Sequence, residues 1–216
     1  MKYFLWSLLL LLSFSSFAQT DIDKVSESEV NSAAGNPYLL KDWNDGVVVF
    51  SSGRVVKQFK LKFDCVNNRL MLQFEGTAFA AESKVKEFTI YTKSGKNKDS
   101  LCFRKGFPAI GDRTDDTYYQ VLVNGKTSLL CLYSKTVMVD KQIVQQGNNR
   151  RLEDKETYYL LQEGKMIELP KNKNDLVAIL PVKNDAMKEF VGQQSFRMEK
   201  PDDFVRIITK YNELLP

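Results

Sequence analysis

The stretch FKLKFDCVNNRLMLQF, from Phe59 to Phe74, decides the fold of this chain. Apolar and polar residues alternate on both sides of Asn67-Asn68, as in two strands joined by a tight turn. A two-residue turn there places Phe63 opposite Leu72, so that apolar residues face one another across the pair. The stretch therefore predicts an antiparallel hairpin with one apolar face and one wet face. On the wet face we expect Lys60, Lys62 and Asp64.

Alternation elsewhere predicts further antiparallel strands. Asn124-Gly125 and Glu163-Gly164 are predicted as hairpin turns because these pairs suit two-residue connections. The hairpin at 117–133 is apolar on both faces, so we expect it in the centre of the sheet. The polar segment 145–155 predicts a loop. The expected strands cover 47–50, 55–65, 84–92, 100–104, 117–123, 126–133, 137–139 and the hairpin 157–169.

Near the C-terminus the apolar period changes from two to 3.6 residues, which predicts helices. Asn174 and Asn184 are expected to cap two short helices, and Pro201 to begin a third. The third has an apolar stripe of Phe204, Ile207, Ile208 and Tyr211. Strands followed by helices predict an α+β fold. We expect an antiparallel β-meander, as a curved sheet or a partly open barrel or sandwich, followed by C-terminal helices.

The first residues predict export. Lys2 precedes an apolar run, and Ser16-Phe17-Ala18 offers small residues at a signal peptidase site before Gln19. The run is shorter than the about 20 residues that a membrane span needs, and no later segment is apolar enough to cross after signal removal. The expected organisation is a signal peptide at 1–18, a flexible leader at 19–34 and a single α+β domain at 35–216, β-rich over 47–169 and helical over 174–214.

The chain contains no histidine, which excludes Ser-His-Asp and Cys-His catalysis and any His-ligated metal site. No catalytic residue, metal site or cofactor site is predicted. Three cysteines are expected as small buried hydrophobes, with one disulfide between two of them as the alternative. These are Cys65, Cys102 and Cys131.

The formal net charge of the chain does not indicate nucleic acid as a partner. The formal net charge is +4, and it falls to +3 when Lys2 leaves with the signal peptide. Asp112, Asp115 and Asp116 cluster in one segment, but their spacing does not match a calcium loop, so a solvated turn is favoured. A carboxylate-dependent hydrolase would need two such acids to converge across a cleft.

Aromatic residues are abundant enough to line a pocket. An apolar pocket between the sheet and the helices would suit a lipid or another hydrophobic ligand, whereas plain core packing is the simpler interpretation. The residues of that possible pocket are Tyr118, Tyr119, Leu122, Leu129 and Tyr133.

The order of features resembles a group of exported proteins of unknown function that are abundant in the Bacteroidota. The matching elements are GNPYLLKDWNDGVVVFSSGRVV at 35–56, the hairpin at 59–74 and a final amphipathic helix ending in KYNEL at 210–214. The resemblance implies a periplasmic or outer-membrane-associated location in a Gram-negative cell. It implies no functional residues.

Together these features favour an exported, non-enzymatic protein that acts as an interaction or accessory module in the bacterial envelope. Its partner would be an envelope protein, and its location the periplasm or the extracellular space, including association with the outer membrane. The alternative is a carrier or sensor of a hydrophobic small molecule or lipid. A carboxylate-dependent hydrolase is the third hypothesis. The oligomeric state stays open.

Overall fold

The computed structural model describes residues 35–94, 97–139, 150–180, 184–197 and 200–216. The expected signal peptide and leader, residues 1–34, lie outside the described residues.

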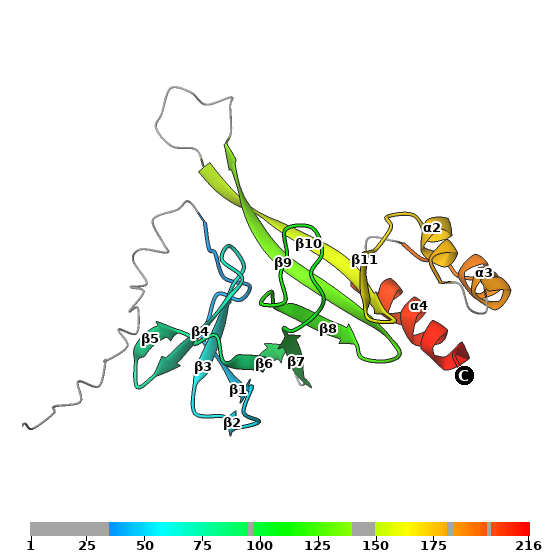
Figure 1. The fold of residues 1–216 in the computed structure, drawn as a ribbon. Coiled ribbons are helices and arrows are strands. Elements are labelled where there is room, and N and C mark those ends of the chain that lie inside the picture. The colour runs from blue at the N-terminus through cyan, green and yellow to red at the C-terminus, as the bar shows by residue number, and fades with distance from the viewer. Residues whose placement is uncertain (1–34, 95–96, 140–149, 181–183, 198–199) are drawn as a thin grey trace, which may run out of the picture.

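Within the described part of the chain, eleven strands form one antiparallel sheet, and short helices follow them (Figure 1). This arrangement confirms the predicted α+β fold with an open, curved sheet. The strands are β1 (Asn44–Phe50), β2 (Val55–Val56), β3 (Lys60–Asp64), β4 (Arg69–Phe74), β5 (Thr77–Ala80), β6 (Val85–Ser94), β7 (Asn97–Arg104), β8 (Tyr119–Val123), β9 (Thr127–Val139), β10 (Arg150–Gln162) and β11 (Lys165–Glu168). The helices are α2 (Lys173–Ala178), α3 (Asn184–Gly192) and α4 (Pro201–Leu214).

The strand order is β11-β10-β9-β8-β7-β6-β1-β3-β4-β5, with β2 paired to β1. From β6 to β11 each strand pairs with the next one in sequence, which is a simple meander. The exception is β1, which lies between β6 and β3 and so joins the early strands β3 to β5 to the later part of the sheet. Between β7 and β8 the ladder is short, with only Phe103 opposite Gln120 and Arg104 opposite Tyr119.

Three apolar clusters form the core. In the first, the helices pack on one face of the β8–β10 region, around Leu129, Leu160, Leu176, Ile207 and Tyr211. In the second, the early strands pack together with β6 and β7, around Leu61, Phe63, Phe88 and Phe103. The third covers the opposite face of β8–β10 and contains Phe107, Tyr119, Leu130, Leu132 and Tyr159. The hairpin at 117–133 is therefore covered on both faces, as its pattern predicts.

The first hairpin forms, but its register differs from the prediction by two residues. Phe63 lies opposite Leu70 rather than Leu72, so the connecting loop has four residues instead of two. The reason is Asp64, whose Oδ1 accepts the backbone N–H groups of Val66 at 2.9 Å and Asn67 at 3.1 Å and so stabilises the wider loop. Because side chains alternate with a period of two, this shift keeps the predicted apolar face.

The prediction that Lys60, Lys62 and Asp64 form a solvent-exposed face of this hairpin is wrong in part. Lys62 is 7% exposed and Asp64 2% exposed, and only Lys60 is open to solvent. The segment before β1 covers this face: the Lys62 ammonium lies 4.7 Å from the ring centroid of Tyr38 and 5.0 Å from that of Trp43. The predicted strand 55–65 is also divided, into β2 and β3.

The connection between β8 and β9 is not the predicted two-residue turn. Neither Asn124 nor Gly125 has a positive φ, and the register shifts so that Val123 lies opposite Leu129. Helix α4 explains the difference: the Asn212 amide accepts the N–H of Thr127 at 2.9 Å and donates to its carbonyl at 2.8 Å. In contrast, Glu163 and Gly164 both have positive φ, as the predicted tight turn requires.

Part of the predicted loop 145–155 is a strand. Residues 145–149 lie outside the described residues, but β10 begins at Arg150 and pairs with β9 along its whole length. The sequence pattern does not predict this part of β10 as a strand, because the strand is not buried on both faces there and its composition is polar.

Helix α2 begins two residues earlier than expected, because Asn172 and not Asn174 caps it. Its N-cap is Asn172, whose side chain accepts the N–H groups of Asn174 at 2.8 Å and Asp175 at 3.0 Å. Helix α4 begins at Pro201 and buries the predicted stripe of Phe204, Ile207, Ile208 and Tyr211. None of the helices in the described ranges is long and apolar enough to cross a membrane.

The contact of Asn212 with the β8–β9 connection gives a first prediction. A Cβ atom added at Gly125 would lie 2.7 Å from the Asn212 Nδ2 atom, so Gly125→Ala displaces the amide from Thr127. We expect this substitution and Asn212→Ala each to lower the unfolding free energy by about 1–3 kcal/mol. Both variants remove the same contact, so the double variant should cost far less than their sum in chemical denaturation. Full additivity would contradict this explanation.

Candidate functional site

Strands β9 and β10 extend beyond the strands on either side of them. They pair with each other over 13 residues each, whereas β8 reaches β9 only at 129–131 and β11 covers β10 only at 159–162. Residues 132–139 and 150–158 therefore form a two-stranded ribbon that projects from the sheet (Figure 1). We call this ribbon the β9–β10 arm.

A groove of about 550 Å³ lies at the base of the arm, where β11 leaves β10. The Leu169 N–H still donates to the Tyr158 carbonyl at 2.8 Å, and beyond this bond no further backbone hydrogen bond joins the described residues 170–171 to β10. We call this hollow the β10 groove. It is lined by Lys155, Glu156, Thr157, Tyr158, Glu168, Leu169, Pro170, Lys171 and Phe204.

The β10 groove combines an aromatic wall with charges of both signs. The Tyr158 ring lies 4.8 Å from the Phe204 ring between centroids, and the Tyr158 hydroxyl donates to the Glu156 carboxylate. Burial raises the pKa of Tyr158, and this hydrogen bond raises it further. The hydrogen bond to Glu156 also fixes the orientation of the Tyr158 hydroxyl.

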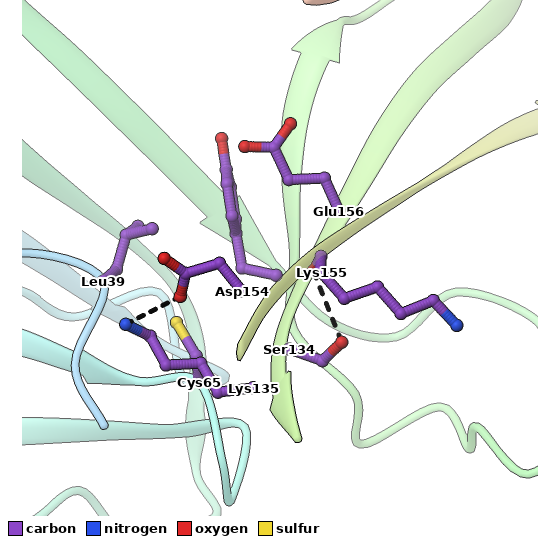
Figure 2. A pocket seen from close by; sticks show the side chains of 8 residues that line it. Leu39, Cys65, Ser134, Lys135, Asp154, Lys155 and Glu156 are labelled. Carbon is purple, nitrogen blue, oxygen red and sulfur yellow. Dashed lines mark hydrogen bonds and ion pairs between the residues drawn. The ribbon is translucent and has the colours of Figure 1, made fainter. Parts of the chain in front are cut away.

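A smaller hollow of about 100 Å³ lies beside the arm, where the loop after β3 and the segment before β1 approach it (Figure 2). An ion pair of 2.8 Å between Lys135 and Asp154 lies at its edge. Lys155 and Glu156 line both this hollow and the β10 groove, so both hollows border the same part of β10. The other lining residues are Leu39, Cys65, Tyr133, Ser134, Lys135 and Asp154.

The thiols near these hollows are not activated. Burial raises the pKa of Cys65 to about 12, although Lys135 offsets part of the rise. Burial also raises the pKa of Cys131 and of Cys102, and all three cysteines are free. A thiol that stays protonated is a poor nucleophile, so this arrangement suits binding better than covalent chemistry.

The structure does not bring the five predicted pocket residues together. Tyr118 belongs to the second cluster, and Tyr133 packs against that cluster. Tyr119 belongs to the third cluster. Leu129 belongs to the first cluster, and Leu122 packs against it. None of the five lines the β10 groove, and Tyr133 alone lines the smaller hollow.

Sequence reasoning missed the polar half of β10, including Glu156, and the aromatic wall of the groove. The sequence pattern predicts Tyr158 on a hairpin and Phe204 on a helical stripe, but nothing in it indicates that the two side chains meet. The one available signal is the alternation Leu152, Asp154, Glu156, which is weak because it is mostly charged.

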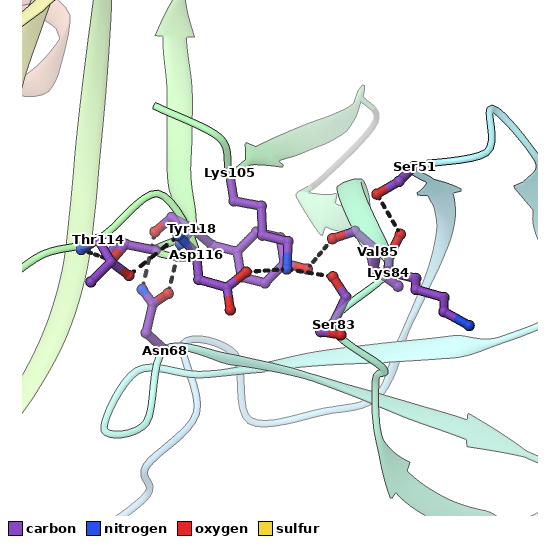
Figure 3. A network of polar contacts seen from close by, with 10 residues as sticks. Ser51, Asn68, Ser83, Lys84, Val85, Lys105, Thr114, Asp116 and Tyr118 are labelled. Atoms are coloured by element: carbon purple, nitrogen blue, oxygen red, sulfur yellow. Dashed lines mark hydrogen bonds and ion pairs between the residues drawn. The ribbon is translucent and has the colours of Figure 1, made fainter. Parts of the chain in front are cut away.

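Tyr118 is instead a structural centre (Figure 3). Its N–H donates to the Asn68 Oδ1 atom at 2.7 Å, and its carbonyl accepts from the Asn68 Nδ2 atom at 3.0 Å. Its hydroxyl donates to the Val85 carbonyl at 2.7 Å, and the Lys105 ammonium lies 5.2 Å from its ring centroid. Tyr118 thus links the first hairpin, β6 and the start of β8.

The acidic cluster does not form a convergent pair. Asp112 is 81% exposed and pairs with Arg113 at 3.2 Å, whereas Asp116 is 71% exposed and pairs with Lys105 at 2.7 Å. The two carboxylates therefore engage different cations. In the described ranges, no group of three or more His, Cys, Asp or Glu residues is arranged to hold a metal ion.

The chain matches no protein-family model, no curated protein and no solved structure.

Two adjacent tyrosines give a matched pair of variants. Tyr118→Phe leaves the buried Val85 carbonyl without its hydroxyl donor, so the unfolding free energy should fall by about 1–2 kcal/mol. The buried Tyr119 hydroxyl has no hydrogen-bond partner among the described residues, so Tyr119→Phe should be neutral or stabilising. Chemical denaturation of the two variants checks this order, and the reverse order would contradict the assigned contacts.

Cys65 predicts a dependence of stability on pH. The folded thiol keeps its proton up to about pH 12, whereas in the unfolded chain it ionises near its ordinary pKa of 9.0. The unfolding free energy should therefore be unaffected by this thiol below pH 9 and fall as the pH rises toward 12. In Cys65→Ala the fall should be smaller. Equal pH profiles for the two proteins would show that Cys65 is not shielded from solvent.

Proposed function

We propose that this protein is an exported, non-enzymatic binding module of the bacterial envelope, and that the β10 groove is its binding site. The observation that carries the proposal is the position of the groove, at the point where β11 ends and β10 continues. An extended segment of a partner protein can enter there in line with β11.

The backbone of β10 supports binding of a peptide. Since the Tyr158 carbonyl faces β11, the same strand edge carries the N–H and C=O groups of Glu156, two residues earlier. No strand in the described part of the chain pairs with this edge at Glu156. Added strands gain affinity from such backbone groups and specificity from pockets beside them.

The side chains of the groove support the same class of ligand. Tyr158 and Phe204 can hold an apolar side chain of the ligand. Lys155 and Lys171 can pair with acidic side chains of the ligand, and Glu156 and Glu168 with basic ones. Four charged side chains make the groove a poor site for a purely hydrophobic molecule. We therefore favour a polypeptide over the lipid or small hydrophobic ligand considered above.

Site-specific photo-crosslinking in intact cells tests the proposal. A photoreactive residue in place of Lys171, inside the groove, should give a discrete adduct with an envelope protein. The same residue in place of Lys188, which is 67% exposed on α3, should not give that adduct.

Charge-matched variants refine this experiment. Glu156→Lys changes the groove and should reduce the Lys171 adduct about tenfold, as expected for the loss of a charged contact of 1–2 kcal/mol. Glu163→Lys, in the exposed β10–β11 turn, makes the same change outside the groove and should leave the adduct unaltered. Equal effects of the two substitutions, or equal adducts from both crosslinking positions, would refute the groove as the binding site.

A further inference from the structure

The outer end of β10 has an open edge next to an unusual charge pattern. Residues Arg150 to Asp154 read RRLED, two cations and two anions around a central leucine. These residues pair with β9 on one side, and on the other side no strand of the described ranges covers them.

The direction of the backbone groups along this edge follows from the ladder. The Tyr158 carbonyl accepts a hydrogen bond on the β11 side, and the N–H and C=O of a residue in an antiparallel strand point to the same side. Alternate residues share that side, so Leu152 and Asp154 also direct their backbone groups to the open edge. Leu152 can therefore exchange two hydrogen bonds with a strand that pairs there.

The segment is self-complementary in the antiparallel direction. If two copies of β10 pair about a two-fold axis at Leu152, Arg150 falls opposite Asp154 of the second copy. In the same register, Arg151 falls opposite Glu153, and Leu152 falls opposite itself. Each charged position of the sequence 150–154 thus lies opposite a position of opposite charge, and Asp154 also pairs with Lys135 of its own copy at 2.8 Å. In this register the two copies of Leu152 form a hydrogen-bonded pair.

Simple protection of the edge does not account for this order. Charged residues guard many exposed strand edges against association, and they do so best when like charges meet in the paired state. Here an antiparallel pairing brings unlike charges together. We propose that this protein forms a two-fold symmetric dimer through antiparallel pairing of β10 with β10 of a second copy, centred on Leu152.

The dimer joins two open sheets into one continuous sheet, which is an isologous contact because the same residues serve both copies. The paired segment ends at Asp154 and the β10 groove begins at Lys155, so the two proposals use adjacent stretches of one strand edge. The dimer is argued from residues 150–154 and does not rest on the peptide-binding proposal.

Charge reversal on one pair of positions tests the proposal. Glu153 is exposed and makes no ion pair with a described residue, so Glu153→Arg should fold normally. In the dimer this variant has an arginine opposite Arg151 of the second copy, and the two-fold axis repeats this like-charged pair. In analytical ultracentrifugation the wild-type chain without residues 1–18 should be a dimer. Glu153→Arg and Arg151→Glu should each weaken dimerisation about tenfold or more, because two attractive pairs become repulsive.

Complementation separates this effect from misfolding. An equimolar mixture of Glu153→Arg and Arg151→Glu should form heterodimers, since the opposed charges are again unlike. The double variant Arg151→Glu with Glu153→Arg has the same composition as the wild type and should dimerise by itself. Failure of both restorations would overturn the proposed register.

A backbone variant tests the hydrogen bonds directly. Leu152→Pro removes an N–H that faces the open edge and not β9, so the fold should be kept while the dimer dissociates. Circular dichroism verifies the fold of the variant.

The leader offers a rival occupant of the same edge. Gly35 lies beside Leu152, because a Cβ atom added at Gly35 would be 3.1 Å from the Leu152 Cβ atom. If residues 19–34 cover the edge, the wild type is a monomer and only a variant that lacks these residues dimerises. A monomeric wild type would overturn the proposal, whether or not that variant dimerises.

Discussion

The contact between the Asn68 amide and the backbone of Tyr118 joins the two halves of the sheet. It matters because the β7–β8 ladder between those halves has only two residue pairs. At the other end of the central hairpin the Asn212 amide binds the backbone of Thr127 in the same way. Each amide supplies one donor and one acceptor and so imitates a neighbouring strand. The β8–β9 hairpin is thereby tied to the first hairpin at its start and to α4 at its turn.

The position of this hairpin determines where the arm begins. Helix α4 and the third cluster cover the inner part of β9 and β10 on opposite faces, so both strands are apolar there. Beyond that cover the same two strands continue as the β9–β10 arm, with charged residues such as Asp154 and Glu156. The β10 groove lies at this transition, and the proposed dimer edge lies farther out on the same strand, at 150–154.

Much of the fold could be predicted from local patterns. The apolar stripe of α4, the turn at Glu163-Gly164 and the two-faced hairpin at 117–133 are confirmed because each depends on residues close in sequence. The predictions that were wrong depend on distant residues. Asn212 changes the β8–β9 connection, and the Tyr38 segment buries Lys62. The candidate site was not predicted, since the meeting of Tyr158 with Phe204 requires the helices to fold back onto β10.

By itself the sequence determined the fold class, most strand and helix positions, and the absence of histidine chemistry, because alternation, capping and composition are local properties. Tertiary structure alone decided which part of β10 is covered. A strand of mixed charge gives no signal of burial, and whether the outer edge of β10 is paired depends on where β11 ends. The groove and the self-complementary edge exist because β10 extends beyond β11, and strand length relative to a neighbour is a property of the assembled sheet.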